Sequence, residues 1–384
     1  MKSKIKLRHS DLLLALLWFS VFPFQLPGKS VYFLQFIFGS IILVYSFKEY
    51  KKMPYFFFVI LFPCVIFISC LINRNAILFT QVARGGTYSI LIIDTFLFTH
   101  LYARKRGKEK LIDNLYIMAK VYFIVSTIGI FWLLFAGKLN DSAENLNLVL
   151  GGKFNTAYMM IIFLILFYSR MYNNKVVLRK REKQTFCMLA CICIWVCFLL
   201  QVSTGMVAIV FLTVLIIIPN DFYKMVNNPL IVTSLIIGSM VVVFFISAIL
   251  TLPIVQKIIV NVLHENLSLT GRTELYQLLY PLLLKSGLWG GGFGSYKAMQ
   301  LGYHGWYNAQ NGLAEIILTY GYMGALTFLI MVFFCALKNK SNYKAINIGI
   351  ITFIVVAIIE VPFDVRFVFL LSIFATVGKM NKKN

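Results

Sequence analysis

The sequence predicts an all-α polytopic membrane protein with about twelve transmembrane helices and one long extracytoplasmic loop that carries amphipathic helices. Of its 384 residues, 60% are hydrophobic and only 13% are charged, and the mean hydropathy is +0.83. Soluble globular proteins carry roughly 25% charged residues, so this composition excludes that class. A membrane-spanning helix needs about 20 mostly apolar residues, and a chain of this length has room for about twelve of them with their loops.

Twelve apolar stretches follow one another along the chain, and we interpret each as a span. They are 11–27, 31–47, 54–72, 85–102, 116–136, 155–171, 185–201, 205–219, 230–253, 311–337, 344–360 and 366–379. The first stretch has a basic flank, as a secretory signal has, but it contains Pro23 and Pro27 and lacks a cleavage site made of small residues. We therefore expect it to be the first span.

The distribution of positive charge predicts the orientation of these spans. Thirty-six Lys and Arg against fourteen Asp and Glu give a net charge of +22, which in a soluble protein would favour nucleic acid. In a membrane protein it reflects topology instead, because cytoplasmic loops collect Lys and Arg. With the N-terminus inside, 25 of these cations fall in cytoplasmic segments and ten outside. We expect both termini to be cytoplasmic and no nucleic acid to be a partner.

We treat 1–384 as one integral membrane domain, within which 254–310 is the longest loop and extracytoplasmic. Loops of this length are usually functional or disordered. This one contains five leucines at helical spacing, which predict a helix from about Gly271 to Ser286. A shorter amphipathic piece is expected near 254–262, and both pieces are expected on the outer membrane face. The run Gly290–Gly294 follows, and we interpret it as a tight turn or as a close backbone approach to a ligand.

Ionisable residues inside the spans are few, and each is a functional candidate because burying a charge in a bilayer is costly. They are Asp94, Lys120, Glu360, Arg84, Asp364 and Arg366. Pairing between helices or snorkelling to an interface is the simpler interpretation for most of them. Arg84 is equally consistent with snorkelling and with binding an anionic ligand. The seven cysteines lie in apolar spans without His or acidic neighbours, so we expect no metal site and no cofactor.

The long loop holds the best group of polar residues. Arg272 opens the predicted helix, and a helix N-terminus with an Arg favours a phosphate. Tyr303, His304 and Trp306 follow, and just beyond them comes Asn311. Aromatic and amide side chains suit a sugar, but an interfacial belt also uses Trp and Tyr, and both interpretations stay open. Glu315 lies one helical turn after Asn311 on the same face.

The motifs of this region resemble the O-antigen ligase and polymerase superfamily. The family hallmark is His, then Asn, Ser or Gln, nine arbitrary residues, Gly, two residues, and Gly, Thr or Tyr. Asn311, the spacing of nine, Gly321 and Gly324 match it, and Gln310 takes the place of the His.

Four further stretches are similar to family features. They are 270–274, Gly290–Gly294, the Asn155 region 154–157 and the hairpin 203–205, where Thr204 stands at a position usually held by Arg.

The resemblance implies a glycosyltransferase-C-like membrane fold in the bacterial plasma membrane. It also implies a metal-independent, inverting transfer of an undecaprenyl-diphosphate-linked oligosaccharide at the outer face. In that chemistry the acceptor hydroxyl attacks the anomeric carbon and the lipid diphosphate leaves. Arg272 is the expected cation for the diphosphate and Arg84 a second one, while His304 or Glu315 is the expected base. Gln310 and Asn311 would lie at the acceptor.

Because both the motif His and the hairpin Arg are absent, the polymerase branch is favoured over the ligase branch. Expected substrate-binding positions are Arg84, Asn155, Tyr303, Trp306, Asn311, Gly321 and Gly324. A chain-length regulator and a flippase are possible partners. Two alternatives stay open, a ligase that transfers polymer to a lipid or wall acceptor and a non-enzymatic flippase of lipid-linked sugar.

Overall fold

The computed structural model describes residues 8–25, 30–137, 148–171, 180–218, 221–245, 249, 252–257, 260–261, 272–294, 308–338 and 343–378. Within these ranges the regular structure is helical and contains no strand. The principal helices are α1 (His9–Val21), α2 (Ser30–Ser46), α3 (Phe56–Ile72), α4 (Phe79–Arg106), α5 (Lys108–Phe135), α6 (Lys153–Met171), α7 (Lys180–Leu199), α8 (Ser203–Ile217), α9 (Pro229–Phe244), α14 (Gly312–Lys338), α15 (Lys344–Val356) and α16 (Val365–Val377).

The shorter elements are the 3-10 helices η1 (Phe47–Lys52) and η3 (Phe222–Asn227) and the helices α11 (Pro253–Lys257) and α12 (Arg272–Lys285). The helix predicted from the leucine spacing is therefore confirmed as α12. The amphipathic piece expected at 254–262 overlaps the five-residue helix α11 and the helical residues 260–261, and its remaining positions 258–259 and 262 lie outside the described residues.

In the described residues, each apolar stretch marked in the sequence overlaps one principal helix. Five of the described helical segments are long and apolar enough to cross a membrane, and six more apolar helices are shorter. The chain is thus an all-helical protein of the membrane-embedded type. Helices α4 and α5 extend past their apolar stretches into 103–106 and 108–115, because Lys, Arg and Glu are good helix formers.

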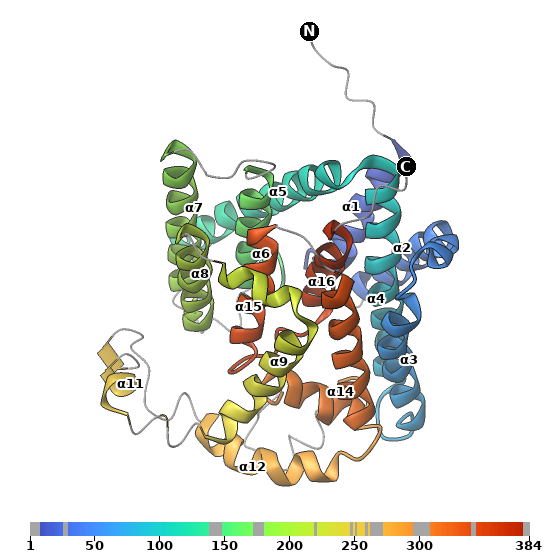
Figure 1. Cartoon of the computed structure of the whole chain (residues 1–384). Helices are drawn as coiled ribbons and strands as arrows, with labels where there is room; N and C mark the ends of the chain where they lie inside the picture. Colours follow the sequence, from blue (N-terminus) through green and yellow to red (C-terminus); the bar gives the residue numbers. More distant parts are fainter. Residues whose placement is uncertain are drawn as a thin grey trace.

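The bundle is built around helices that are apolar on every side. α14 packs against α3 and α9, and α4 packs against α2, α3 and α16. α6 is buried between α5, α7 and α15, which explains why nearly all its residues are apolar and inaccessible. α7 and α8 form an antiparallel pair at one side, and α12 runs across one end of the bundle (Figure 1).

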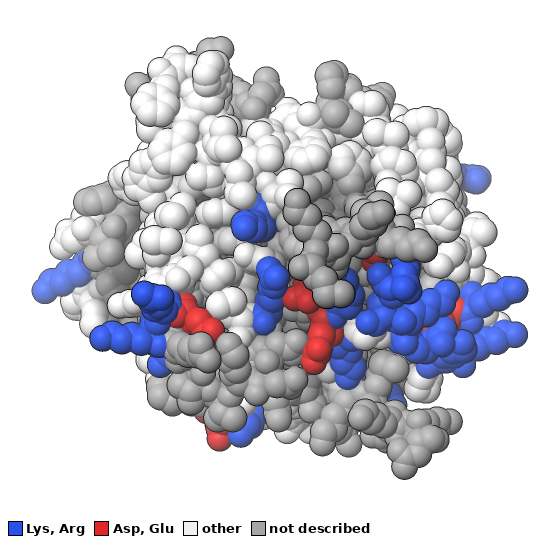
Figure 2. All heavy atoms as spheres, turned by 90° about the horizontal axis from the view of Figure 1, so that it is seen from above, with Lys and Arg blue, Asp and Glu red and all other residues white. Residues whose placement is uncertain are grey.

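The bundle has two ends, here named the α12 end and the termini end. The α12 end comprises the N-terminal ends of α4, α6, α8, α14 and α16 and the C-terminal ends of α3, α9 and α15 (Figure 1). The termini end is opposite, where α1 begins and α16 finishes. Seen from the termini end, the surface carries many Lys and Arg side chains with few acids between them (Figure 2).

Candidate active site at the α12 end

Helix α14 is broken inside its sequence motif. Gly321 has φ 72° and ψ −173°, which is not helical. The glycine-rich segment 287–294 fills the break: the N–H groups of Gly291 and Gly292 donate to the carbonyls of Leu318 (2.9 Å) and Thr319 (2.7 Å). In return, Tyr322 and Met323 donate to the carbonyls of Gly287 (3.2 Å) and Leu288 (3.1 Å). The segment therefore satisfies backbone groups that the break would leave unpaired, as burial in a membrane requires.

The glycines of this region allow the two backbones to approach. A Cβ on Gly321 would collide with the carbonyl oxygen of Leu288, and a Cβ on Gly290 would lie 2.5 Å from the nitrogen of Gly321. A Cβ on Gly324 would collide with Tyr320, one turn back along the same helix. The glycine run contains the expected turns, and its backbone closely approaches α14; the alternative approach to a ligand stays a prediction. Gly321 and Gly324 thus determine how closely neighbouring atoms pack around the break in α14.

Three polar side chains hold the glycine segment against α3 and α4. Ser69 donates its hydroxyl to the carbonyl of Trp289, and Asn73 donates its amide to the carbonyl of Gly290 at 3.0 Å. Gln81 donates to the carbonyl of Gly294 at 2.7 Å. Sequence reasoning missed these residues, because a single amide or hydroxyl near the end of an apolar helix carries no distinguishing pattern.

Asn311 is buried at the start of α14, with 0% of its surface exposed. Its amide donates to the carbonyls of Ala357 (2.8 Å), Ser239 (3.1 Å) and Ile358 (3.2 Å). Its side-chain oxygen accepts from the N–H of Ala314 at 3.0 Å, the interaction of a helix N-cap. The structure therefore places Asn311 beneath the surface of the site, where it joins α14 to α9 and α15.

The residues around Asn311 form the adjoining turn. Gln310 has φ 50°, and its carbonyl accepts the hydroxyl of Tyr276 of α12 at 2.9 Å. The carboxylate of Glu315 accepts the N–H of Ala309 at 2.8 Å. Arg272 begins α12 one turn before Tyr276, so the start of α12 lies close to Gln310 and the start of α14.

The three aromatic-loop candidates, Tyr303, His304 and Trp306, lie outside the described residues.

A second polar group joins α6 to α16. Arg366 donates its Nε to Asp364 at 2.7 Å and an Nη to the side-chain oxygen of Asn155. Asn155 is held in turn by the carbonyl of Leu150 at 2.9 Å, and the guanidinium of Arg366 lies 5.3 Å from the ring centroid of Tyr158. Arg366, Asn155 and Leu150 line a cavity of about 140 Å³ together with Gln35. The structure thus brings Asn155 to a cation 211 residues away in the chain.

The connection between α15 and α16 links these groups into one site. Ala357 and Ile358 receive Asn311, and two residues later Glu360, 4% exposed, accepts the hydroxyl of Thr204 at 3.3 Å. Asp364 then caps α16 and holds Arg366. Glu360 and Arg366 therefore pair with other helices, as expected. The connection 357–366 contacts Asn311, Thr204 and Asn155.

Three further candidates from the sequence lie elsewhere. Arg84 is on α4, where its guanidinium lies 3.7 Å from the ring centroid of Tyr32. Asp94 is fully buried in the same helix, and neither of its carboxylate oxygens has a hydrogen-bond partner within the described ranges. In contrast, Lys120 is exposed on α5.

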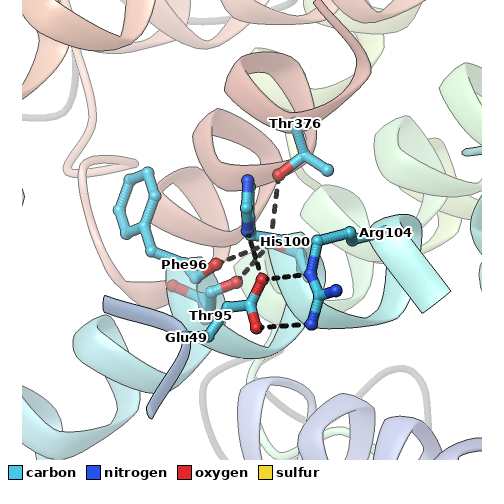
Figure 3. Close-up of polar contacts among 7 residues, drawn as sticks. Glu49, Thr95, Phe96, His100, Arg104 and Thr376 are labelled. Carbon is cyan, nitrogen blue, oxygen red and sulfur yellow. Dashed lines mark hydrogen bonds and ion pairs between the residues drawn. The ribbon is translucent and has the colours of Figure 1, made fainter. Parts of the chain in front are cut away.

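The termini end has polar clusters of its own. Glu49, 3% exposed, accepts Nε of Arg104 at 2.6 Å and a second guanidinium nitrogen at 3.0 Å, and it lies 3.1 Å from Nδ1 of His100 (Figure 3). Asp11 accepts Tyr102 at 2.5 Å and also Arg106 and Asn114. These carboxylates are surrounded by partners, so the geometry is that of an interhelical ion-pair network.

Within the residues that the structure describes, no group of three or more His, Cys, Asp or Glu side chains is arranged to hold a metal ion. The cysteines among them are free thiols. Comparison of the chain with protein-family models, with curated proteins and with solved structures finds no match in any of the three.

Proposed function

We propose that this chain polymerises undecaprenyl-diphosphate-linked oligosaccharide repeat units of a bacterial surface polysaccharide, by metal-independent glycosyl transfer at the outer face of the plasma membrane. The observation that supports it most is the gathering of the motif positions at one end of the bundle. There α12 contacts the Gln310–Glu315 turn through Tyr276, and Asn311 of that turn and Asn155 of α6 both bond to the connection 357–366. The product would belong to an O-antigen, a capsule or an exopolysaccharide.

The proposal includes a topology of twelve spans with both termini cytoplasmic and a fold of the glycosyltransferase-C type. Lys and Arg gather on the surface seen from the termini end (Figure 2), and cytoplasmic segments are enriched in these residues. The α12 end would then face outward, together with the loop 254–310. That orientation places the candidate site where a lipid-linked repeat unit is presented after translocation.

The chemistry needs a cation for the departing diphosphate and an acceptor hydroxyl held in line with the anomeric carbon. Arg272 at the start of α12 is the proposed primary cation, since a helix N-terminus and a guanidinium both favour phosphate. Arg366 is the proposed second cation near the same end, and Asp364 orients its guanidinium. The carboxylate of Glu315 or the imidazole of His304 would accept the hydroxyl proton, and neutralisation of the diphosphate would supply most of the driving force.

The sugar would be held by the remaining positions. Tyr303 and Trp306 are proposed to stack on sugar faces, and Gln310 is proposed to hydrogen-bond the acceptor. Asn311 would act indirectly, because its amide already binds three carbonyls of the protein. A flippase that delivers repeat units and a chain-length regulator are the proposed partners.

The deciding experiment is deletion of the gene in its host, followed by complementation and a polysaccharide gel. Loss of the ladder with a single-repeat band remaining supports the polymerase. Long polymer that stays on its carrier lipid supports a ligase instead. Arg272→Ala and Arg366→Ala are expected to complement at less than a tenth of the wild-type level, whereas Lys257→Ala, an exposed cation of α11, is expected to complement fully. Full complementation by both arginine variants would contradict the site.

A flippase is the second candidate, and the break at Gly321 favours it, because transporters use interrupted helices to bind their cargo. Two of the carbonyls next to the break, however, already accept N–H groups of the glycine segment. The two functions differ in where the repeat unit accumulates on deletion. A flippase mutant would retain lipid-linked single repeats on the cytoplasmic side, and a polymerase mutant would expose them outside, where an impermeant sugar oxidant labels them.

A further inference from the structure

A long apolar groove runs along the bundle between α2, α3 and α4. Its volume is about 810 Å³, within the range of pockets that bind small ligands, and Tyr32, Phe36, Pro63, Phe67, Arg84 and Gly86 are among its lining residues. The hydroxyls of Thr87 and Ser89, which also line it, donate to the carbonyls of Ala83 and Gly85 in their own helix. The groove therefore presents a hydrocarbon surface, and Phe33 and Phe79 at its edge are 66% and 84% exposed.

Arg84 is the cation of this groove, and it lies in the first turns of α4, at the α12 end. Its guanidinium lies against the ring of Tyr32, and no acidic side chain pairs with it in the described part of the chain. An aromatic contact leaves the planar N–H fork available for a phosphate. A long apolar groove with one unmatched guanidinium toward its α12 end has the polarity of a lipid with an anionic headgroup.

The groove adjoins the candidate active site through the same two helices. On α2, Gln35 lies about one turn beyond Tyr32 and lines the Arg366 cavity. On α4, Tyr88 lies one turn beyond Arg84, close to Asp364 and Arg366, and its ring centroid is 5.5 Å from that of Phe293. A phosphate at Arg84 would thus lie about one helical turn from the groups around Arg366.

We propose that this groove binds the hydrocarbon chain of a polyprenyl diphosphate, with Arg84 contacting the diphosphate and the attached sugar directed toward Arg366. The identity of the lipid rests on the proposed function, whereas the groove and its cation do not. The single chain of a polyprenyl carrier suits one groove with one cation toward its α12 end. The groove would hold the carrier lipid in a fixed position while its attached sugar reacts.

The test is binding of undecaprenyl diphosphate to the purified full-length protein in detergent, measured by native mass spectrometry. Arg84→Ala is expected to weaken binding at least tenfold and Arg84→Lys to restore part of it. Gly86→Leu is expected to block the groove without unfolding the protein, because a Cβ there would make only ordinary contacts with Phe67, at 3.6 and 3.8 Å. The matched controls are Arg74→Ala, an exposed arginine after α3, and Gly238→Leu, a glycine of α9 with open space beside it.

The inference is supported if both groove variants lose binding, both controls keep it, and neither phosphatidylglycerol nor inorganic phosphate competes at tenfold excess. Unchanged binding in Arg84→Ala and Gly86→Leu would overturn it. Equal competition by phosphatidylglycerol would also overturn it, since the groove would then hold ordinary bilayer lipid. Because binding is measured without turnover, failure of the polymerase proposal would leave this result standing, and normal polymerisation by a non-binding groove variant would overturn only the role of the groove.

Discussion

The two ends of the bundle use polar residues in different ways. At the termini end, carboxylates are surrounded by cations and lysines cap helix ends: Lys108 donates to the carbonyls of Val377 and Gly378, and Lys344 donates to those of Ile216 and Ile218. At the α12 end, amides and hydroxyls bind backbone carbonyls around a broken helix, and the cations Arg84 and Arg366 line cavities. Polar side chains at the termini end join helices to one another, whereas those at the α12 end line the cavities of the candidate site.

This contrast predicts that substitutions at the two ends separate stability from function. A change at the termini end should lower stability and leave the activity of each folded molecule intact. A change at the α12 end should affect the site even where the fold survives. Four substitutions, from the largest expected effect to the smallest, test the contrast.

The largest effect is expected from Gly321→Ala. At φ 72° and ψ −173° an alanine is strained by about 1–3 kcal/mol, and its Cβ would also collide with Leu288, so the glycine segment cannot dock. We expect little folded protein by fluorescence-detected size-exclusion chromatography. Gly287→Ala is the matched control, because Gly287 also has a positive φ, 64°, but nothing within 4 Å of its added Cβ. Equal yields of the two variants would refute the role of the break.

The next effect is expected from Arg104→Ala at the termini end. It leaves the buried carboxylate of Glu49 without its bidentate partner, which costs about 2–3 kcal/mol, less than the roughly 3–5 kcal/mol of a fully buried pair because the Arg104 side chain is 33% exposed. Thermal unfolding in detergent measures the loss. The double variant Glu49→Gln, Arg104→Ala should recover part of it, because no buried charge remains. Reduced polymerisation per folded molecule would break the contrast between the ends.

Asn311→Ala is expected to cost about 1–3 kcal/mol, since the carbonyls of Ser239, Ala357 and Ile358 lose their shared donor inside the protein. Unlike Arg104→Ala, it should also lower polymerisation, because it loosens the join between α14 and the connection 357–366. Asn228→Ala, which removes an exposed cap of α9, is the control and should lose stability only. Normal activity of folded Asn311→Ala would show that this join does not orient the site.

The smallest effect is expected from Asp113→Ala. Its ion pair with Arg170 spans 3.2 Å, but the two side chains are 40% and 44% exposed, and such pairs contribute about 0–1 kcal/mol. We expect an unfolding temperature within about 1–2 °C of the wild type and an unchanged polysaccharide ladder. If Asp113→Ala lowered the unfolding temperature as much as Arg104→Ala, the different burial of the two ion pairs would not explain their contributions to stability.

Much of the helical layout could be predicted from the sequence, because the signals are local. An apolar stretch marks each principal helix, and the leucine spacing marks α12. The same local logic identified the run Gly290–Gly294 as unusual, and the resemblance to the family motif identified Gly321. These signals depend only on the residues within one or two helical turns, so folding does not alter them.

The partners of these residues were decided by the tertiary structure. No local pattern indicates that the glycine run fills the break in α14, that Arg366 reaches Asn155, or that Asn311 is buried beneath the site. Helices that are apolar on every side carry no sequence record of which neighbour they face, so contacts between distant turns follow only from packing. The sequence by itself determined the helices and the unusual residues, and packing decided which of those residues form a site and which support it.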